Sequence, residues 1–245
     1  MKRILYVLPL ILQTLIWIPT RIVLKVFAHL EVIGLENLKN VRGGVIFAPN
    51  HSSELDPGLL PASLPFFSPL MPMFYTSRER SFYKFSSWRK LFYGGLLFKI
   101  WGAYPVYPGQ NDFSKALVHH IDILRSGKSV CLFPEGKRTR NGEMGSAKAG
   151  IAYLADATDC PIVPVCIIGS FNVALKDFLL GRKYFVVTFG EPILRKRLFG
   201  KSRKPPSPYD YDRYKEKADF IMYKILELKK GYIEQPVFQK TAKVV

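Results

Sequence analysis

The sequence predicts an α/β fold in which a mostly parallel central sheet is flanked by helices. Short apolar runs bounded by turn residues alternate with stretches of helical periodicity, which is typical of βαβ units. The chain has 245 residues, 48% hydrophobic and 14% aromatic, so it can build a sizeable core and is too apolar for global disorder. The runs expected to form strands are residues 44–47, 103–107, 129–133, 162–168 and 184–189.

Residues 1–29 are predicted to form an N-terminal membrane-associated helical hairpin or an interfacial anchor. Pro9 interrupts the first apolar run, residues 4–18, and Pro19 ends it. This run is shorter than the roughly 20 residues needed to cross a bilayer. The next piece, residues 20–27, carries two cations one helical turn apart beside an apolar stripe, which is typical of a helix lying on a membrane surface.

Two other interpretations of this segment compete. A single spanning helix over residues 4–27, kinked at a proline, would also place the protein at a membrane. A signal peptide would share the basic start and the short apolar core, but no small-residue cleavage site follows. The hairpin, the anchor and the spanning helix all indicate a membrane-associated protein, which we expect on the cytoplasmic face.

Residues 30–200 are predicted to form the α/β domain. Residues 30–37 have the pattern of a strand and a turn that lead into the core. Residues 61–72 are rich in proline and are expected to be irregular. Residues 71–75 are expected to form an edge strand, because proline rarely occupies central strands.

Several helices are expected in the rest of the chain. Residues 81–100 are dense in aromatic and basic side chains, so this helix would lie on lipid, line an acyl-chain tunnel or pack in an ordinary core. Residues 113–125 form an amphipathic pattern that ends at a glycine. A further helix is expected at residues 147–156. Residues 201–245 comprise a basic, proline-rich connector and a charged helix over residues 209–229.

The charge of the chain is strongly positive, +17 from 36 Lys and Arg against 19 Asp and Glu. Such an excess favours nucleic acid, an anionic membrane or a phosphorylated substrate as partner. Cys131, Cys160 and Cys166 lack metal-ligand spacing and are expected to be buried thiols in a reducing compartment. His119 and His120 also lack a partner at such a spacing, so we expect packing or surface roles for them and no metal site.

A histidine and an aspartate follow the first predicted strand of the domain. His51 lies in the loop after residues 44–47, and Asp56 precedes Pro57 at the start of a predicted helix. Loops at strand ends carry the chemistry of many α/β folds, and histidine is the side chain suited to taking a proton near neutral pH. An acid that holds the second ring nitrogen fixes the tautomer. The alternative is that Asp56 only caps the helix and that His51 is an ordinary loop residue.

A second polar constellation follows the strand predicted at residues 129–133. Residues 133–142 place three cations close to glycines, which suits a loop that holds phosphate. The loop does not match a P-loop, and a basic surface loop is the alternative. Glu135 would neutralise an arginine, orient it or accept a hydrogen bond from a substrate hydroxyl. The candidate substrate-binding residues are Glu135, Gly136, Lys137, Arg138 and Arg140.

Together these motifs resemble those of the 1-acyl-sn-glycerol-3-phosphate acyltransferases, the lysophosphatidic acid acyltransferases. The resemblance consists of His51-x4-Asp56, then Phe133-Pro134-Glu135-Gly136-x-Arg138, then the Ile-Val-Pro-Val run at residues 162–165, in the family's order and spacing. It covers about residues 30–195.

The resemblance implies direct acyl transfer, with His51 as the general base and Asp56 as the residue that holds it. The donor would be acyl-CoA or acyl-carrier protein, the acceptor a lysophospholipid hydroxyl, and the product phosphatidic acid. No cofactor is implied beyond this co-substrate, and the loop at Glu135, Gly136 and Arg138 would bind the glycerol phosphate. Neither Ser52 nor Ser53 lies in a Gly-x-Ser-x-Gly elbow, in agreement with direct transfer.

The sequence departs from the family pattern between the two motifs. Tyr107 and Pro108 stand where the family carries an arginine, and Lys137 replaces a threonine. These departures leave another lysolipid, or an amphipathic alcohol or amine, open as the acceptor, with Lys137 or Arg140 as compensating cations.

Two other functional classes compete with the acyltransferase. A thioesterase or lysolipid hydrolase would use the same histidine and aspartate to activate water, but it would leave the phosphate loop without a role. A basic membrane-surface or nucleic-acid-binding protein should spread its cations along one face with aromatic residues for stacking. The cations instead gather in the Arg138 loop, the N-terminal segment and the tail, so we expect anionic membrane lipids and no nucleic acid as partners.

Overall fold

A computed structural model of the chain describes residues 2–78, 96–107, 112–201 and 205–234. A seven-stranded sheet forms its centre. The strands are β1 (Glu31–Ile33), β2 (Val45–Pro49), β3 (Met73–Arg78), β4 (Ala103–Val106), β5 (Ser129–Cys131), β6 (Ile162–Ile168) and β7 (Val186–Phe189). The helices are α1 (Lys2–Ala28), η1 (Leu35–Leu38), α2 (Asp56–Ser63), α4 (Leu96–Trp101), α5 (Phe113–Ala116), α6 (Val118–Arg125), α7 (Gly150–Thr158), α8 (Leu175–Leu179), α9 (Arg195–Phe199) and α10 (Tyr211–Ile233).

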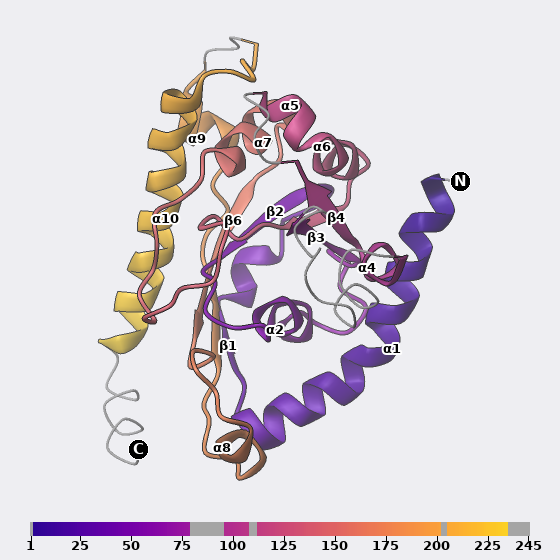
Figure 1. Cartoon of the computed structure of the whole chain (residues 1–245), viewed down its shortest axis with the longest axis vertical. Coiled ribbons are helices and arrows are strands. Elements are labelled where there is room, and N and C mark those ends of the chain that lie inside the picture. The colour runs from indigo at the N-terminus through magenta and orange to yellow at the C-terminus, as the bar shows by residue number, and fades with distance from the viewer. Residues whose placement is uncertain (1, 79–95, 108–111, 202–204, 235–245) are drawn as a thin grey trace, which may run out of the picture.

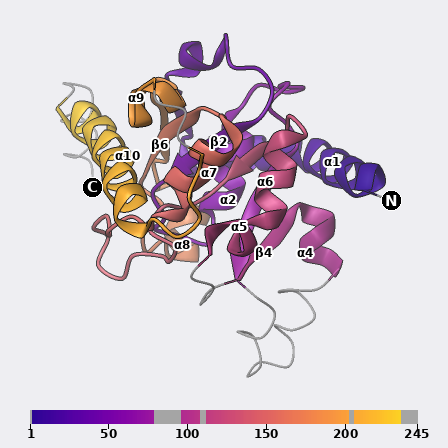
Figure 2. The ribbon, with the colours of Figure 1, turned by 90° about the horizontal axis from the view of Figure 1, so that it is seen from above.

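The strands are ordered β1-β7-β6-β2-β5-β3-β4, and neighbouring strands are parallel except for β6 and β7. Helices cover both faces, with α1 and α2 on one side and α10 on the other (Figures 1 and 2). The expected α/β class, a mostly parallel sheet flanked by helices, is confirmed.

Alternation along the strands explains the two helical layers. Ile46 and Ala48 of β2 belong to the hydrophobic cluster that contains α6, α7 and α10, whereas Val45 and Phe47 belong to the cluster that contains α1 and α2. Successive side chains of a strand point to opposite faces, so a strand that is apolar throughout requires cover on both. Each residue of β2 is buried accordingly.

The N-terminal segment forms one helix, α1, and the expected hairpin is wrong. Pro9 and Pro19 both lie inside this helix, which bends along its length (Figure 1). An internal proline removes one backbone hydrogen bond and kinks a helix, but reversing the chain also needs turn residues such as glycine, asparagine or aspartate. The segment around Pro19 contains none of these. Residues Tyr6–Ala28 are long and apolar enough to cross a membrane by length and composition.

Polar side chains on the inner face of α1 attach it to the domain. The amide of Gln13, 2% exposed, donates to the carbonyls of Met73 at 2.7 Å and Trp101 at 3.0 Å, and it accepts from the Met73 N–H at 2.8 Å. The Trp17 indole and the Arg21 guanidinium donate to backbone carbonyls at the end of α2. The helix therefore lies along the domain, and its outer face remains exposed and apolar.

Two expectations about the proline-rich region were wrong. Strand β3 is internal, paired with β4 and β5, because Pro72 precedes it and so withholds no hydrogen bond from the sheet. The segment expected to be irregular from residue 61 begins inside α2, which ends at Ser63. The helix expected at residues 81–100 lies outside the described residues except for its end in α4.

The amphipathic helix expected at residues 113–125 is divided at Leu117 into α5 and α6. In an unbroken helix the His120 N–H would bond to the Ala116 carbonyl. That carbonyl instead accepts from the Tyr107 N–H at 3.2 Å, and the His120 N–H bonds to Leu117. The end of β4 thus takes the hydrogen bond that would have continued the helix.

His120 is fully buried, as expected for a packing residue, and burial lowers its pKa to about 4. Its folded pKa lies below the ordinary histidine value of about 6.5, so the neutral form stabilises the fold above that pH. This contribution, on the order of 3 kcal/mol, should disappear as the pH falls from about 6.5 to 4.

We therefore expect His120→Gln to reduce the acid sensitivity of unfolding. The measurement is the urea midpoint in detergent at neutral and mildly acidic pH, with His29→Gln, at an exposed histidine, as the matched control. Equal loss of stability on acidification in wild type and in His120→Gln would contradict the assignment.

Candidate active site

Three adjacent strands bring the predicted site residues to one edge of the sheet. Strand β2 lies between β6 and β5, and all three run parallel. Their carboxyl ends therefore meet, which is where open α/β sheets place functional groups. His51 follows β2, Glu135 follows β5, and Ser170 follows β6.

His51 and Asp56 form the pair that their spacing predicted. Nδ1 of His51 lies 2.9 Å from Oδ2 of Asp56, whose side chain is fully buried. The same oxygen accepts from the backbone N–H groups of Ser52 at 2.7 Å and Ser53 at 2.8 Å. Asp56 is the first residue of α2, and its carboxylate bonds to the loop before the helix, so it orders the loop that carries the histidine.

Ser170 completes this arrangement and was not predicted from the sequence. Its hydroxyl donates to Oδ1 of Asp56 at 2.7 Å and lies 2.8 Å from the Ser52 hydroxyl. Gly169, which precedes it, has a φ of +89, a backbone conformation that side chains rarely adopt, and a Cβ there would lie 1.9 Å from the Tyr184 carbonyl oxygen. Only glycine fits this turn, which places the buried Ser170 hydroxyl beside the Asp56 carboxylate.

The loop that follows β5 also contacts the ring of His51. The ring stacks on Phe133 with 3.9 Å between centroids and 21° between planes. Because Asp56 accepts hydrogen bonds from all its partners, Nδ1 carries the hydrogen and Nε2 keeps its lone pair. Within the described part of the chain no hydrogen bond occupies Nε2, and the side chain is 17% exposed.

Glu135 occupies a different position from the one expected for a substrate ligand. It is 4% exposed, and its two oxygens accept from the backbone N–H groups of His51 at 2.9 Å and Gly145 at 2.8 Å. Charge-assisted hydrogen bonds of this kind are short and strong. The carboxylate thus connects the basic loop to the main chain of His51.

The basic loop lies beside His51. The Thr139 N–H donates to the His51 carbonyl at 2.9 Å, and Arg138 pairs with Glu54 at 3.0 Å. Lys137 and Arg140 are exposed and form no ion pair with the residues that the structure describes. Gly136 has a φ of +68, which favours glycine, and a Cβ there would meet the Lys148 side chain at 3.3 Å. Lys148 is therefore a further cation at the loop, one that the sequence motifs did not indicate.

Neither neighbouring serine is arranged as a nucleophile. The Ser52 hydroxyl faces Ser170, and that of Ser53 accepts from the Leu55 N–H. Cys131 is buried, and burial raises the pKa of its thiol well above the usual range. Among the described residues no group of three or more His, Cys, Asp or Glu side chains could hold a metal ion.

Of the two residues that stand where the family carries an arginine, the structure describes Tyr107. Tyr107 follows the edge strand β4, two strands beyond β5, and its hydroxyl lies 3.3 Å from Nε2 of His119. Pro108 lies outside the described residues.

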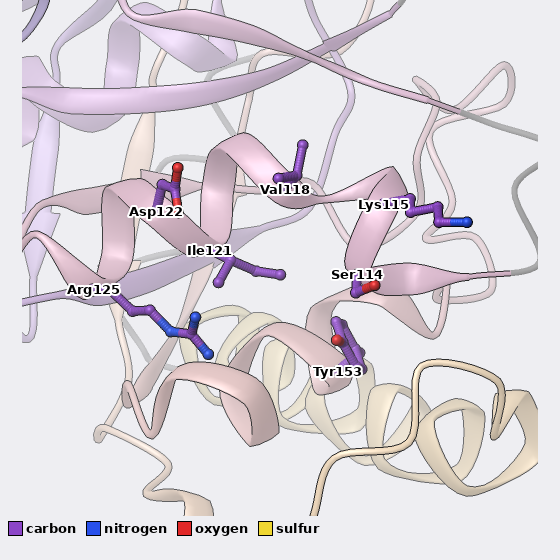
Figure 3. A pocket seen from close by; sticks show the side chains of 7 residues that line it. All are labelled: Ser114, Lys115, Val118, Ile121, Asp122, Arg125 and Tyr153. Carbon is purple, nitrogen blue, oxygen red and sulfur yellow. The ribbon is translucent and has the colours of Figure 1, made fainter. Parts of the chain in front are cut away.

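A cavity of about 500 Å³ lies elsewhere, between α6 and α7 (Figure 3). Arg125 at its border donates to the Ala157 carbonyl at the end of α7, which accounts for its position. We assign this cavity no chemistry. It is lined by Ser114, Lys115, Val118, Ile121, Asp122, Arg125 and Tyr153.

The fold and the site define an α/β protein with a histidine–aspartate pair and a basic loop at the carboxyl edge of its sheet. The sequence model of the family described as Acyltransferase matches residues 29–168. The chain therefore belongs to the acyltransferase family, and the resemblance indicated by the motifs is confirmed.

The relatives are 1-acyl-sn-glycerol-3-phosphate acyltransferases. The chloroplastic enzymes of Arabidopsis thaliana and Brassica napus are each 28% identical over 153 residues, 60% of this chain and 38% and 39% of theirs. The chain thus spans about two-fifths of the length of these curated relatives. The crystal structure of the Thermotoga maritima 1-acyl-sn-glycerophosphate acyltransferase has a similar fold, with a TM-score of 0.55 and 20% identity, over 89% of this chain and 81% of that one.

Proposed function

We propose that this protein transfers a fatty acyl group from an acyl thioester to the free hydroxyl of 1-acylglycerol-3-phosphate, which gives phosphatidic acid. The donor is acyl-CoA or acyl-carrier protein. The observation that carries this proposal is the His51 ring, held at Nδ1 by Asp56 with Nε2 free of protein partners in the described residues. Membership in the acyltransferase family and the names of the relatives support the same activity.

The mechanism needs only the side chains at this edge of the sheet. Nε2 of His51 takes the proton of the acceptor hydroxyl, and the oxygen attacks the thioester carbonyl. The carbon–sulfur bond then breaks, and the sulfur leaves as a thiol with the proton from the imidazolium. Asp56 holds the tautomer and stabilises the imidazolium, so it accepts hydrogen bonds throughout.

We assign the acceptor phosphate to the basic loop. Gly136 allows close approach of the backbone, and Lys137, Arg138 and Arg140 supply exposed cations. Arginine binds phosphate oxygens through two parallel N–H groups. Glu135 acts as a positioning residue, because its carboxylate joins this loop to the His51 backbone.

The lipid substrate is consistent with the exposed face of α1. We propose that this helix lies in the cytoplasmic interface of an anionic membrane, because its inner face is bonded to the domain through Gln13. A helix attached in this way cannot leave the domain to span a bilayer without breaking those hydrogen bonds.

The test is product identity. Purified protein in detergent is offered radiolabelled acyl-CoA or acyl-carrier protein with a panel of lysolipids. Conversion of lysophosphatidic acid into phosphatidic acid is the expected result. Transfer to another acceptor alone would keep the roles of His51 and Asp56 and would refute the proposed acceptor.

Arg138→Ala is expected to raise the KM for lysophosphatidic acid about tenfold and to leave the KM for the acyl donor nearly unchanged. A hydrogen bond to a charged group contributes about 1.5–3 kcal/mol, and the exposure of Arg138 favours the lower end. Steady-state kinetics with each substrate varied in turn would measure this difference.

Glu54→Gln is expected to change the acceptor KM in the opposite direction. Glu54 pairs with Arg138 and competes with a phosphate, so its neutralisation should lower the acceptor KM. Arg42→Ala, in the loop before β2 at the other end of the sheet, is the matched arginine control. Equal changes in both KM values for Arg138→Ala would contradict the assignment of the loop.

A further inference from the structure

The segment between β6 and β7 exposes an unusual amount of apolar surface. None of the residues of α8 is buried. Leu175, Leu179 and Leu180 are 72%, 56% and 54% exposed. Soluble proteins carry single exposed leucines, but a cluster of them on one short segment marks an interaction surface.

This surface continues from the outer face of α1. The ring of Phe178 lies 6.0 Å from that of Phe27, and the Gly181 carbonyl lies 2.8 Å from Nε2 of His29. Figure 1 shows α8 beside the C-terminal end of α1. The two elements therefore present one apolar surface, to which α1 contributes Val7, Leu8, Leu10, Ile11, Leu15, Ile18, Ile22, Val23 and Val26.

The same segment begins at the active site. Ser170 donates to Asp56, and the next residue, Phe171, lies against the basic loop, where a Cβ added to Gly142 would be 3.1 Å from its ring. Phe171 is 39% exposed. The chain thus leads from the catalytic pair, past the phosphate-binding loop, to the helix that we place in the membrane.

The charges around the leucines fit an anionic lipid surface. Lys176, Arg182 and Lys183 surround them, and Asp177, the one acid between residues 175 and 184, pairs with Arg182 at 3.8 Å and Lys183 at 3.9 Å. Three cations against one acid give this stretch a net charge of +2. Apolar residues bordered by basic ones are typical of elements that insert at the headgroup boundary of anionic membranes.

We propose that residues 171–184 form a second membrane-contacting element, with Leu175, Leu179 and Leu180 inserted in an anionic bilayer. The inference rests on the membrane location given above for α1. It places the edge of the sheet that carries His51 at the level of the lipid headgroups. A lysolipid can then reach Nε2 while its acyl chain stays in the bilayer.

The test uses the full chain with an environment-sensitive fluorophore attached at Leu179→Cys. The native cysteines, Cys131, Cys160 and Cys166, are buried and so are protected from labelling. Tyr223→Cys, at a 52% exposed position of α10 on the other face of the sheet, is the matched control. Both proteins are mixed with phosphatidylcholine vesicles that contain phosphatidylglycerol and, in a second series, a nitroxide lipid.

We expect the label at residue 179 to shift to shorter wavelength and to be quenched by the nitroxide lipid, and the label at residue 223 to do neither. In addition, Leu175→Ser/Leu179→Ser/Leu180→Ser should lower the vesicle partition coefficient about tenfold or more, because three apolar side chains that leave water on insertion are replaced by polar ones.

An aqueous spectrum at residue 179 in membrane-bound protein would overturn the proposal, as would a shift produced only by acidic acyl-carrier protein. These results are independent of turnover. If the wild type makes phosphatidic acid and the label stays in water, only this proposal fails. If no lysolipid is acylated, the proposed function fails instead, whatever the label reports.

Discussion

Replacing His51 by alanine is expected to lower kcat by about 10²–10⁴-fold, the usual contribution of a positioned acid–base group. The variant loses the imidazole that Asp56 holds at Nδ1 and whose Nε2 has no hydrogen-bond partner among the described residues. Folding and vesicle binding should remain, because the ring is partly exposed and the proposed membrane contacts lie on α1 and α8. Kinetics with lysophosphatidic acid, circular dichroism and vesicle flotation measure the three properties.

Two variants sharpen this experiment. Asp56→Asn should also lower kcat, because an amide accepts at only one of the two positions where this carboxylate accepts. His29→Ala, at an exposed histidine between α1 and β1, controls for the loss of an imidazole in the kinetic measurement. Near-normal turnover in His51→Ala would remove the general-base assignment.

Asp156→Ala is expected to destabilise the fold by about 3–5 kcal/mol, the typical cost of breaking a buried ion pair. The Asp156 side chain is fully buried on α7 and accepts from Arg195 at 2.7 Å and from the Tyr214 hydroxyl at 2.8 Å. Arg213 adds a third contact at 3.4 Å. These residues join α7 to α9 and α10, so the substitution leaves two arginines without their acid.

The shift of the urea midpoint measures this effect, with Asp219→Ala as the control. Asp219 pairs with Lys215 one turn away on α10, and it is 52% exposed. A pair of this type contributes at most about 0.5 kcal/mol. If both variants lost equal stability, the Asp156 cluster would not be a principal link between the C-terminal helix and the domain.

Much of the fold and the site could be predicted because local pattern and topology agree. Apolar runs separated by helical patterns require parallel strands, and parallel strands bring their carboxyl ends together. This explains why His51 and Arg138, 87 positions apart by their numbers, lie in adjoining loops. The pairing of His51 with Asp56 followed from their spacing around the start of α2.

The features that were missed depend on distant contacts. The Ser170 hydroxyl binds Asp56 only because β6 lies next to β2, and a serine after a strand has no distinctive local pattern. The helix is interrupted at Leu117 because the Tyr107 N–H, directly after β4, bonds to the Ala116 carbonyl. The Gln13 amide, a polar exception in an apolar run, binds backbone groups of β3 and α4.

The prolines were misread for a different reason. Proline affects only the hydrogen bond of its own nitrogen and the carbonyl one turn before it, so Pro19 bends α1 without ending it. Pro72 stands before the first residue of β3, where its missing N–H costs the sheet nothing. Both prolines are evident in the sequence, but the effect of each on the structure depends on its position within or before the helix or strand.

The measurement that tests direct acyl transfer most simply is the stoichiometry of thiol release in a single turnover. The enzyme is mixed with radiolabelled acyl-CoA, first alone and then with lysophosphatidic acid, and free thiol, labelled lipid and labelled protein are counted. We expect no free thiol without acceptor, one thiol per phosphatidic acid with it, and no acylated protein. Thiol release without an acylated lipid, or label on the protein, would contradict it.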